Sequence, residues 1–132
     1  MKRSIIAVVA GVVFIVVAST LVDILLHAVD VYRPWGEPLS QADAVLATSY
    51  RIVISMLGAA LTAWLAPRAP LRHALYLGAV GTLLGLAALA ATWGNGLAPA
   101  WYPIALVLLA VPQCWAGGLL FLRASSAEAK RS

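Results

Sequence analysis

The amino-acid sequence predicts an all-α integral membrane protein, an antiparallel four-helix bundle with both chain ends on the cytoplasmic side. Three observations lead to this fold class: a strongly apolar composition, four long apolar segments, and a one-sided distribution of basic residues. Of the 132 residues, 63% are hydrophobic and 11% are charged, whereas soluble domains contain about 45–50% apolar and about 25% charged residues. This composition excludes a soluble globular domain, and a single cysteine excludes a disulfide-stabilised scaffold.

Four apolar segments are long enough to cross the hydrocarbon core of a bilayer, which takes roughly 20 helical residues. None of them alternates polar and apolar residues as a transmembrane β-strand does. Because lipid offers the backbone no hydrogen-bond partner, each segment is expected to form one continuous helix. The helices are predicted near residues 4–32, 43–66, 71–93 and 101–123, within one transmembrane domain of residues 1–132 that ends in a cytoplasmic tail, residues 124–132.

Prolines and polar residues separate the predicted helices. Pro34 and Pro38 are expected to end the first helix, because proline cannot continue a helical hydrogen-bond pattern. The segment SQAD, residues 40–43, has the form of a capping box at the start of the second helix. Pro67 and Pro70 shorten the next turn so much that the second and third helices are predicted to be antiparallel neighbours.

Basic residues are distributed unequally between the two ends of the predicted helices. Seven of the nine lysines and arginines fall at the N-terminus, in the segment APRAPLR, or after the fourth helix, and these regions share one side. The positive-inside rule makes that side cytoplasmic. The net charge of +4 is therefore explained by topogenic residues near an anionic membrane surface, and no nucleic-acid partner is expected.

Asp23 and Arg51 are predicted to form an ion pair within the membrane. At about 1.5 Å per residue, Asp23 lies about 28 Å along the first helix from the inner boundary and Arg51 about 22 Å along the second. A charged residue in lipid is costly, so each is expected to have a partner, and these two helices are adjacent and antiparallel. The pair is interpreted either as a structural clamp or as a gated site that binds a substrate or relays protons.

A second candidate site is the face formed by Asp23, His27 and Asp30. Their spacings of four and three residues place the side chains on one side of a helix. Two carboxylates beside an imidazole could hold a divalent metal or handle protons. The first helix is longer than the hydrocarbon is thick, so a solvated helix end is the alternative interpretation, and no metal is assigned to these residues.

Signatures of catalytic sites are not found in the sequence. A haem held by His27 and His73 is excluded because the two residues are predicted at opposite membrane surfaces. Cys114 lies in the middle of a helix among apolar residues and has no neighbouring histidine to activate it. The sequence therefore predicts neither an enzyme nor a cofactor.

The fourth predicted helix is interrupted within the segment AVPQCWAGG. Pro112 removes a helical hydrogen bond and leaves the carbonyl of Leu108 without its usual donor, so a kink is expected there. Gln113 is the nearest donor, and it is interpreted either as part of a kinked packing helix or as a substrate contact. Trp115 is expected in the bundle core, where its indole N–H would find a partner.

Small residues predict two faces along which helix backbones approach closely. The third helix contains two glycines in GxxxG spacing, and the second helix has small residues at every fourth position. These packing residues are Gly78, Gly81 and Gly85 in the third helix and Ser55, Ala59 and Ala63 in the second. The sequence leaves open whether they pack within the chain or form the seam of a homodimer.

Nearly the whole chain resembles a known group of proteins. The segments YRPWGEPLS, SYRIVISMLGA, LAPRAPLRHAL and PAWYPIALVLLAVPQCWAGG are similar to those of uncharacterised small four-helix proteins of the bacterial inner membrane. This resemblance implies a bacterial inner-membrane location and brings no activity, substrate or catalytic residue. The small multidrug-resistance transporters differ from this chain because they carry a membrane-embedded glutamate in their first helix.

Two hypotheses about function follow. The first is a non-enzymatic accessory or interaction subunit whose helices pack, within the bilayer, against another membrane protein or a second copy of the chain. The alternative is a small oligomeric transporter or channel that uses Asp23, Arg51 and Gln113 as polar pathway residues. A transporter needs a water-connected polar cavity, whereas an interaction subunit needs an exposed packing surface.

Overall fold

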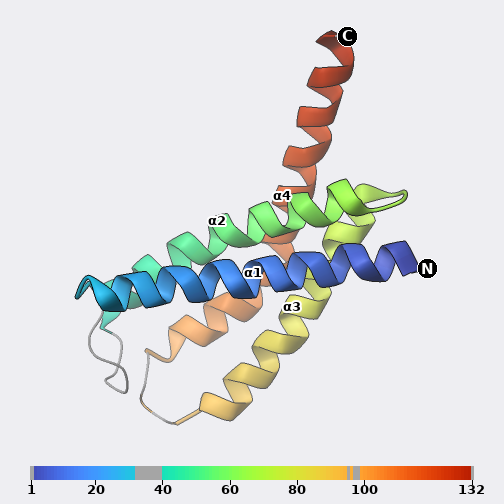
Figure 1. Ribbon diagram of the computed structural model, residues 1–132. Coiled ribbons are helices and arrows are strands. Elements are labelled where there is room, and N and C mark those ends of the chain that lie inside the picture. Colours follow the sequence, from blue (N-terminus) through green and yellow to red (C-terminus); the bar gives the residue numbers. More distant parts are fainter. Residues whose placement is uncertain (1, 32–39, 95, 97–98, 132) are drawn as a thin grey trace.

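The computed structural model consists of four helices that run alternately in opposite directions (Figure 1). They are α1 (Lys2–Ala28), α2 (Gln41–Leu65), α3 (Pro70–Thr92) and α4 (Trp101–Arg131). The structure describes residues 2–31, 40–94, 96 and 99–131, and no strand occurs among them. All four helices have the length and hydropathy needed to cross a membrane. The predicted all-helical bundle is therefore confirmed.

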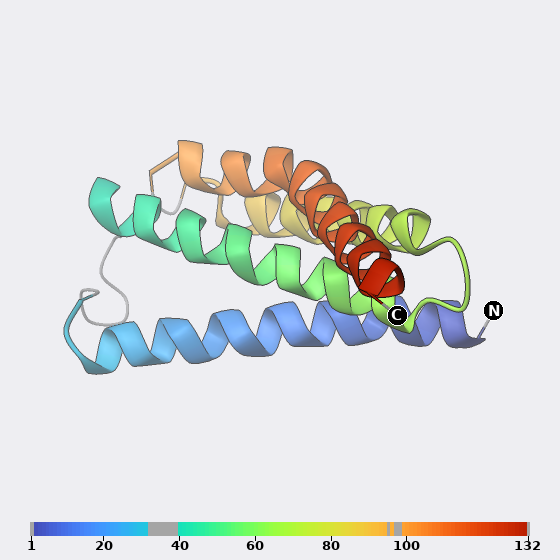
Figure 2. The same ribbon diagram turned by 90° about the horizontal axis from the view of Figure 1, so that it is seen from above.

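The helices are arranged so that α2 lies between α1 and α4 (Figure 2). α4 packs most extensively against α3 and then against α2, whereas α1 packs against α2 and to a smaller extent against α3. The first helix is thus the peripheral member of the bundle. Of its 27 residues, only Ala7, Gly11 and Ser19 are buried.

The first helix ends earlier than the predicted boundary at residue 32. The Val31 N–H donates to the Leu26 carbonyl at 2.9 Å and the Asp30 N–H to the His27 carbonyl at 3.3 Å, which together form a Schellman motif. Asp30 adopts the left-handed conformation that this motif requires, with φ of 61°. The apolar pattern predicted too long a helix because hydropathy does not indicate where a backbone cap of this kind ends a helix. Residues 32–39, which include Pro34 and Pro38, lie outside the described residues.

The start of α2 carries the predicted capping box. The Asp43 N–H donates to the Ser40 hydroxyl at 3.1 Å, and the Ser40 N–H donates to the Asp43 carboxylate at 3.4 Å. After α2 ends at Leu65, α3 begins at Pro70, where the missing proline N–H costs little. The turn between them is short, and α2 and α3 are antiparallel and in contact, as predicted.

The fourth helix is longer than predicted and continues through Pro112. Its axis changes direction along its length, and its last part projects away from the other helices (Figure 1). Residues beyond 123, which were predicted as a tail, continue the helix to Arg131. Three alanines, one glutamate, one lysine and one arginine occur in that segment, and all of these residue types have high helix propensity.

Trp115 is 48% exposed, so its predicted place in the core is wrong. The inward face of α4 at this height is formed by Cys114, Gly117 and Gly118, all of which are buried. Trp115 lies next to Cys114 in the chain, and successive residues on a helix point in directions about 100° apart. The small residues therefore occupy the interface, and the large indole is turned outward.

Small side chains form most of the core. They let helix backbones approach closely, so that van der Waals contact holds the helices together. The buried small residues are Ala7, Gly11, Ser19, Ala44, Ala47, Ser55, Gly58, Ala59, Ala63, Ala74, Gly78, Ala110, Gly117 and Gly118. Leu77 and Thr62 are the largest side chains that are fully buried.

The predicted packing faces are used inside the chain, but both of them face α4. A Cβ atom added to Gly78 would lie 3.0 Å from the Val111 Cα, and one added to Gly85 would lie 3.0 Å from a Val107 methyl. On α2, Ala59 contacts Gly117, which the sequence analysis did not single out. The faces are therefore occupied by α4 and do not form an exposed seam for a homodimer.

The contact between Gly117 and α2 is predicted to be the least tolerant of added volume. A Cβ on Gly117 would lie 2.9 Å from the Ala59 Cβ and still closer to the Met56 carbonyl. Gly117→Ala should therefore lower the free energy of unfolding by about 1–3 kcal/mol, because the backbones are forced apart.

Gly81→Ala is the matched control, since a Cβ there meets only the Ala110 Cβ at an ordinary 3.6 Å. Thermal unfolding of both variants in detergent should show a loss for Gly117→Ala alone. Equal unfolding temperatures would contradict the close contact between α4 and α2.

Candidate functional site

Asp23 and Arg51 form an ion pair that joins α1 to α2. An Arg51 terminal nitrogen, Nη2, lies 2.7 Å from Asp23 Oδ2. The hydroxyl of Tyr50 donates a hydrogen bond to the other carboxylate oxygen, Asp23 Oδ1. Both oxygens of the carboxylate therefore have a donor from α2. The sequence prediction of this pair agrees with the structure.

The fourth helix also contributes to this polar cluster. The phenol oxygen of Tyr102, in the first turn of α4, approaches the Arg51 guanidinium closely enough to interact with it. The side chains of Asp23 and Arg51 are 24% and 30% exposed, so both are largely buried within the protein. We call Asp23, Tyr50, Arg51 and Tyr102 the polar cluster. It connects three helices, and its two formal charges cancel.

The two tyrosines of the polar cluster were not identified from the sequence. Neighbouring residues such as Tyr50 and Arg51 point in directions about 100° apart on a helix, so the pattern did not suggest that both reach Asp23. Tyr102 comes from a distant part of the chain, and only the packing of α4 against α2 brings it to the cluster. The indole N–H of Trp101 also donates a hydrogen bond of 2.6 Å to the side-chain oxygen of Gln41, which joins the start of α4 to the start of α2.

A cavity of about 380 Å³ lies beside the polar cluster, with walls from all four helices. Apolar side chains form most of its lining, and Cys114 is part of it. Its polar residues are Ser19 from α1, Arg51 and Ser55 from α2, and Gln113 from α4. The structure thus brings Arg51 and Gln113, two of the residues that the transporter hypothesis named, to the same cavity.

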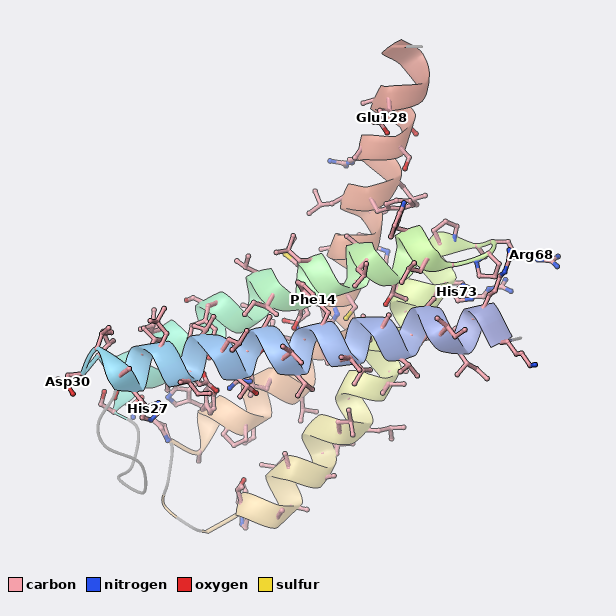
Figure 3. All side chains as sticks on the ribbon, in the orientation of Figure 1. Phe14, His27, Asp30, Arg68, His73 and Glu128 are labelled. Carbon is pink, nitrogen blue, oxygen red and sulfur yellow. The ribbon has the colours of Figure 1, made fainter. Side chains whose placement is uncertain are left out.

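Asp23, His27 and Asp30 do not form one continuous site. The Asp23 carboxylate is bound to Arg51 and Tyr50, and His27 Nδ1 lies 2.7 Å from the Asp23 backbone carbonyl. Asp30 lies beyond the end of α1, where its left-handed conformation takes it off the helical face. Figure 3 shows His27 and Asp30 at the end of α1. Among the residues that the structure describes, no group of three or more His, Cys, Asp or Glu could hold a metal.

His27 and His73 lie near opposite ends of the bundle (Figure 3), as the sequence predicted when it excluded a shared haem. His73 is only 5% exposed. Its Nδ1 lies 3.0 Å from the Ala69 carbonyl, and its ring makes an edge contact with Tyr76. His73 is therefore part of the packed start of α3.

Comparison of the chain with protein-family models, with curated proteins and with solved structures found no match.

A double-mutant cycle tests how much the ion pair stabilises the bundle. Asp23→Asn leaves the Arg51 charge without its partner, and Arg51→Gln leaves the Asp23 charge without its partner, so each should destabilise the protein. The double variant leaves neither charge behind and should recover part of the loss. A coupling energy of about 1 kcal/mol is expected, as for other polar contacts between membrane helices.

The measurement is unfolding of the four proteins of the cycle in detergent. Ser49→Ala is a suitable control on the same helix, because its exposed hydroxyl binds only the Val45 carbonyl of its own helix. Losses that simply add, with no recovery in the double variant, would show that the pair contributes no mutual stabilisation.

Proposed function

We propose that this chain is a non-enzymatic, multi-pass protein of the bacterial inner membrane that acts as an accessory subunit by packing against another membrane protein. Four helices of sufficient length and hydropathy support the membrane assignment. The bacterial inner membrane is proposed from the sequence resemblance to uncharacterised small four-helix proteins.

Both chain ends are proposed to lie in the cytoplasm. The supporting observation is that seven of the nine basic residues belong to the N-terminus, the α2–α3 turn with the start of α3, and the end of α4. The N-terminus and the α2–α3 turn lie at the same end of the bundle, whereas the end of α4 projects away from the other helices (Figure 1). Basic residues flanking membrane helices are retained on the cytoplasmic side.

A reporter fused after Ser132 should therefore report a cytoplasmic location. An alkaline phosphatase fusion is expected to be inactive there, and a fluorescent-protein fusion should be bright. The control is the same pair of reporters inserted after Gly96, in the segment between α3 and α4, with the reverse result expected. A phosphatase signal from the C-terminal fusion would contradict the proposed orientation.

The surface of α1 is the observation that carries the proposed accessory role. Seven of the nine large hydrophobic side chains exposed on this helix are valine or isoleucine. The large aliphatic side chains exposed on α3, in contrast, are all leucines. The exposed surface of α1, which we call the α1 surface, consists of Ile5, Ile6, Val9, Val13, Val16, Val17, Leu21, Ile24 and Leu25.

β-branched side chains favour a protein partner at the α1 surface over lipid alone. Their χ1 angles are already restricted on a helix, so they lose little conformational entropy when they pack against another helix. Association of helices within a membrane depends on such van der Waals packing. The partner that fits is an apolar transmembrane helix, because the α1 surface carries no charged residue between Arg3 and Asp23.

Site-specific photocrosslinking tests this proposal. A photoreactive amino acid at Val13, which is 53% exposed on α1, should give one discrete protein adduct in native membranes. The matched control is the same residue at Leu83, which is 67% exposed on α3 and should react with lipid alone.

The mass of the adduct identifies the partner. A mass of twice this chain would show that the partner is a second copy, and a different mass would show a separate membrane protein. Val9→Trp should abolish the adduct by disrupting the α1 surface, whereas Leu86→Trp on α3 should not. Equal adducts at Val13 and Leu83, or none at either, would contradict a partner at the α1 surface.

Transport is a second candidate function, favoured by one specific observation. Arg51 and Gln113 line the same cavity, and Arg51 is paired with Asp23. Against transport of ions stands the largely apolar lining of that cavity, because an ion or a water column needs polar groups along its path. The accessory role is therefore the function that the geometry supports best.

A further inference from the structure

The cavity between the four helices contains polar atoms that the protein itself leaves without partners. The hydroxyl of Ser19 and the Nε atom of Arg51 are both buried, and neither has a hydrogen-bond partner among the described residues. Both residues line the cavity of about 380 Å³. A buried donor without a partner costs free energy, so such atoms mark a place where a bound molecule would be stabilised.

Ser19 differs from other hydroxyl residues in the helices. Thr48, Ser49, Thr82 and Thr92 each donate to the backbone carbonyl four residues earlier in the same helix, at 2.8–3.0 Å. The Ser19 hydroxyl makes no such bond, although the residue is only 4% exposed. Its hydroxyl is thus a buried donor without an acceptor among the described residues, on a residue that lines the cavity.

The charges around the cavity select a neutral ligand. The Arg51 guanidinium is neutralised by Asp23 at 2.7 Å, so an anionic ligand would have to compete with that carboxylate. The remaining Nε–H and the Ser19 hydroxyl are able to donate hydrogen bonds to an uncharged acceptor such as a carbonyl oxygen. The apolar walls require that the rest of the ligand be hydrocarbon.

The position of the cavity distinguishes between two kinds of carbonyl lipid. Arg51 lies about 15 Å from the start of α2, and Gln113 about 18 Å from the start of α4, at 1.5 Å per residue. The ester carbonyls of a phospholipid stay close to its charged headgroup at the membrane surface. A neutral molecule with no charged headgroup reaches this depth more easily.

We propose that this cavity binds a neutral lipophilic molecule through a carbonyl group, with an isoprenoid quinone as the type of compound that fits. The Ser19 hydroxyl and Arg51 Nε–H donate to the carbonyl oxygen, and the apolar walls enclose the ring and the beginning of the chain. A hydrocarbon chain alone would leave both donors without a partner. This binding site goes beyond the proposed accessory role and does not depend on it.

Binding is measured by equilibrium dialysis with the purified full-length protein in phosphatidylcholine vesicles. The probe is a ubiquinone that carries one isoprene unit, and vesicles without protein correct for partitioning into lipid. Saturable binding of one molecule per chain is expected. An isoprenoid hydrocarbon of similar length is the comparison ligand and should bind at least ten-fold more weakly, because it lacks the carbonyl acceptor.

Two pairs of variants locate the site. Ser19→Ala should weaken binding about five-fold by removing one hydrogen bond, whereas Ser49→Ala, whose hydroxyl is exposed and bound to its own helix, should bind as the wild type does. Gly81→Leu should fill part of the cavity and prevent binding. Leu83→Phe, on the exposed side of the same helix, should leave binding unchanged.

Thermal unfolding of each variant separates loss of the site from loss of the fold. Equal affinity for the quinone and the hydrocarbon would overturn the proposal, and so would unchanged binding by a folded Ser19→Ala variant. Stoichiometric phospholipid retained by the purified protein, and displaced by neither probe, would assign the cavity to a phospholipid instead. The photocrosslinking at the α1 surface is a separate measurement, so either proposal can fail without the other.

Discussion

Close approach of helix backbones at glycine and alanine positions is the constraint on which the rest of this structure depends. In lipid, apolar helices gain no advantage from burying apolar surface against one another. Van der Waals contact between such small residues holds them together instead. The contact of Gly117 with Ala59 brings α4 against α2, and the contact of Gly11 with Thr62 brings α1 against α2. Thr62 adds a buried hydrogen bond of 2.9 Å to the Ala7 carbonyl. α2 is therefore the central element of the bundle.

The polar cluster follows from this packing. α1 and α4 lie on different sides of α2 (Figure 2), yet Asp23 and Tyr102 both reach Arg51, because the arginine side chain is long enough to extend between the two helices. The same arrangement leaves a cavity beside the cluster, lined by side chains from all four helices. The ion pair and the cavity are thus two consequences of the same geometry. The guanidinium uses Nη2 for the ion pair, and its Nε has no hydrogen-bond partner among the described residues.

The surface of the protein suggests a division of roles between its helices. The small residues of α3 and α4 pack against neighbouring helices, and those of α2 pack against both α4 and α1, so these faces are not available to a partner. α1 contributes little to the core and exposes stiff β-branched side chains along its length. An accessory subunit needs one such surface for its partner. The proposed ligand cavity lies between the helices and is separate from this surface. The extension of α4 beyond the bundle (Figure 1) adds a helical segment with basic residues on the side proposed to be cytoplasmic.

The sequence by itself determined the number of helices, their approximate limits, the capping box at Ser40 and Asp43, and the pairing of Asp23 with Arg51. These features depend on local hydropathy, on capping chemistry and on the cost of leaving a charge alone in lipid, all of which can be read from a single chain. The tertiary structure alone decided which helix each glycine contacts, where α1 ends, and which side Trp115 faces. It also decided that Tyr50 and Tyr102 belong to the polar cluster and that Ser19 and Gln113 line the cavity beside it. Small residues occur on several faces of each helix, so the sequence is compatible with several arrangements in which the helix backbones approach equally closely. The choice among them depends on side chains distant in the chain, and only the folded bundle brings these together.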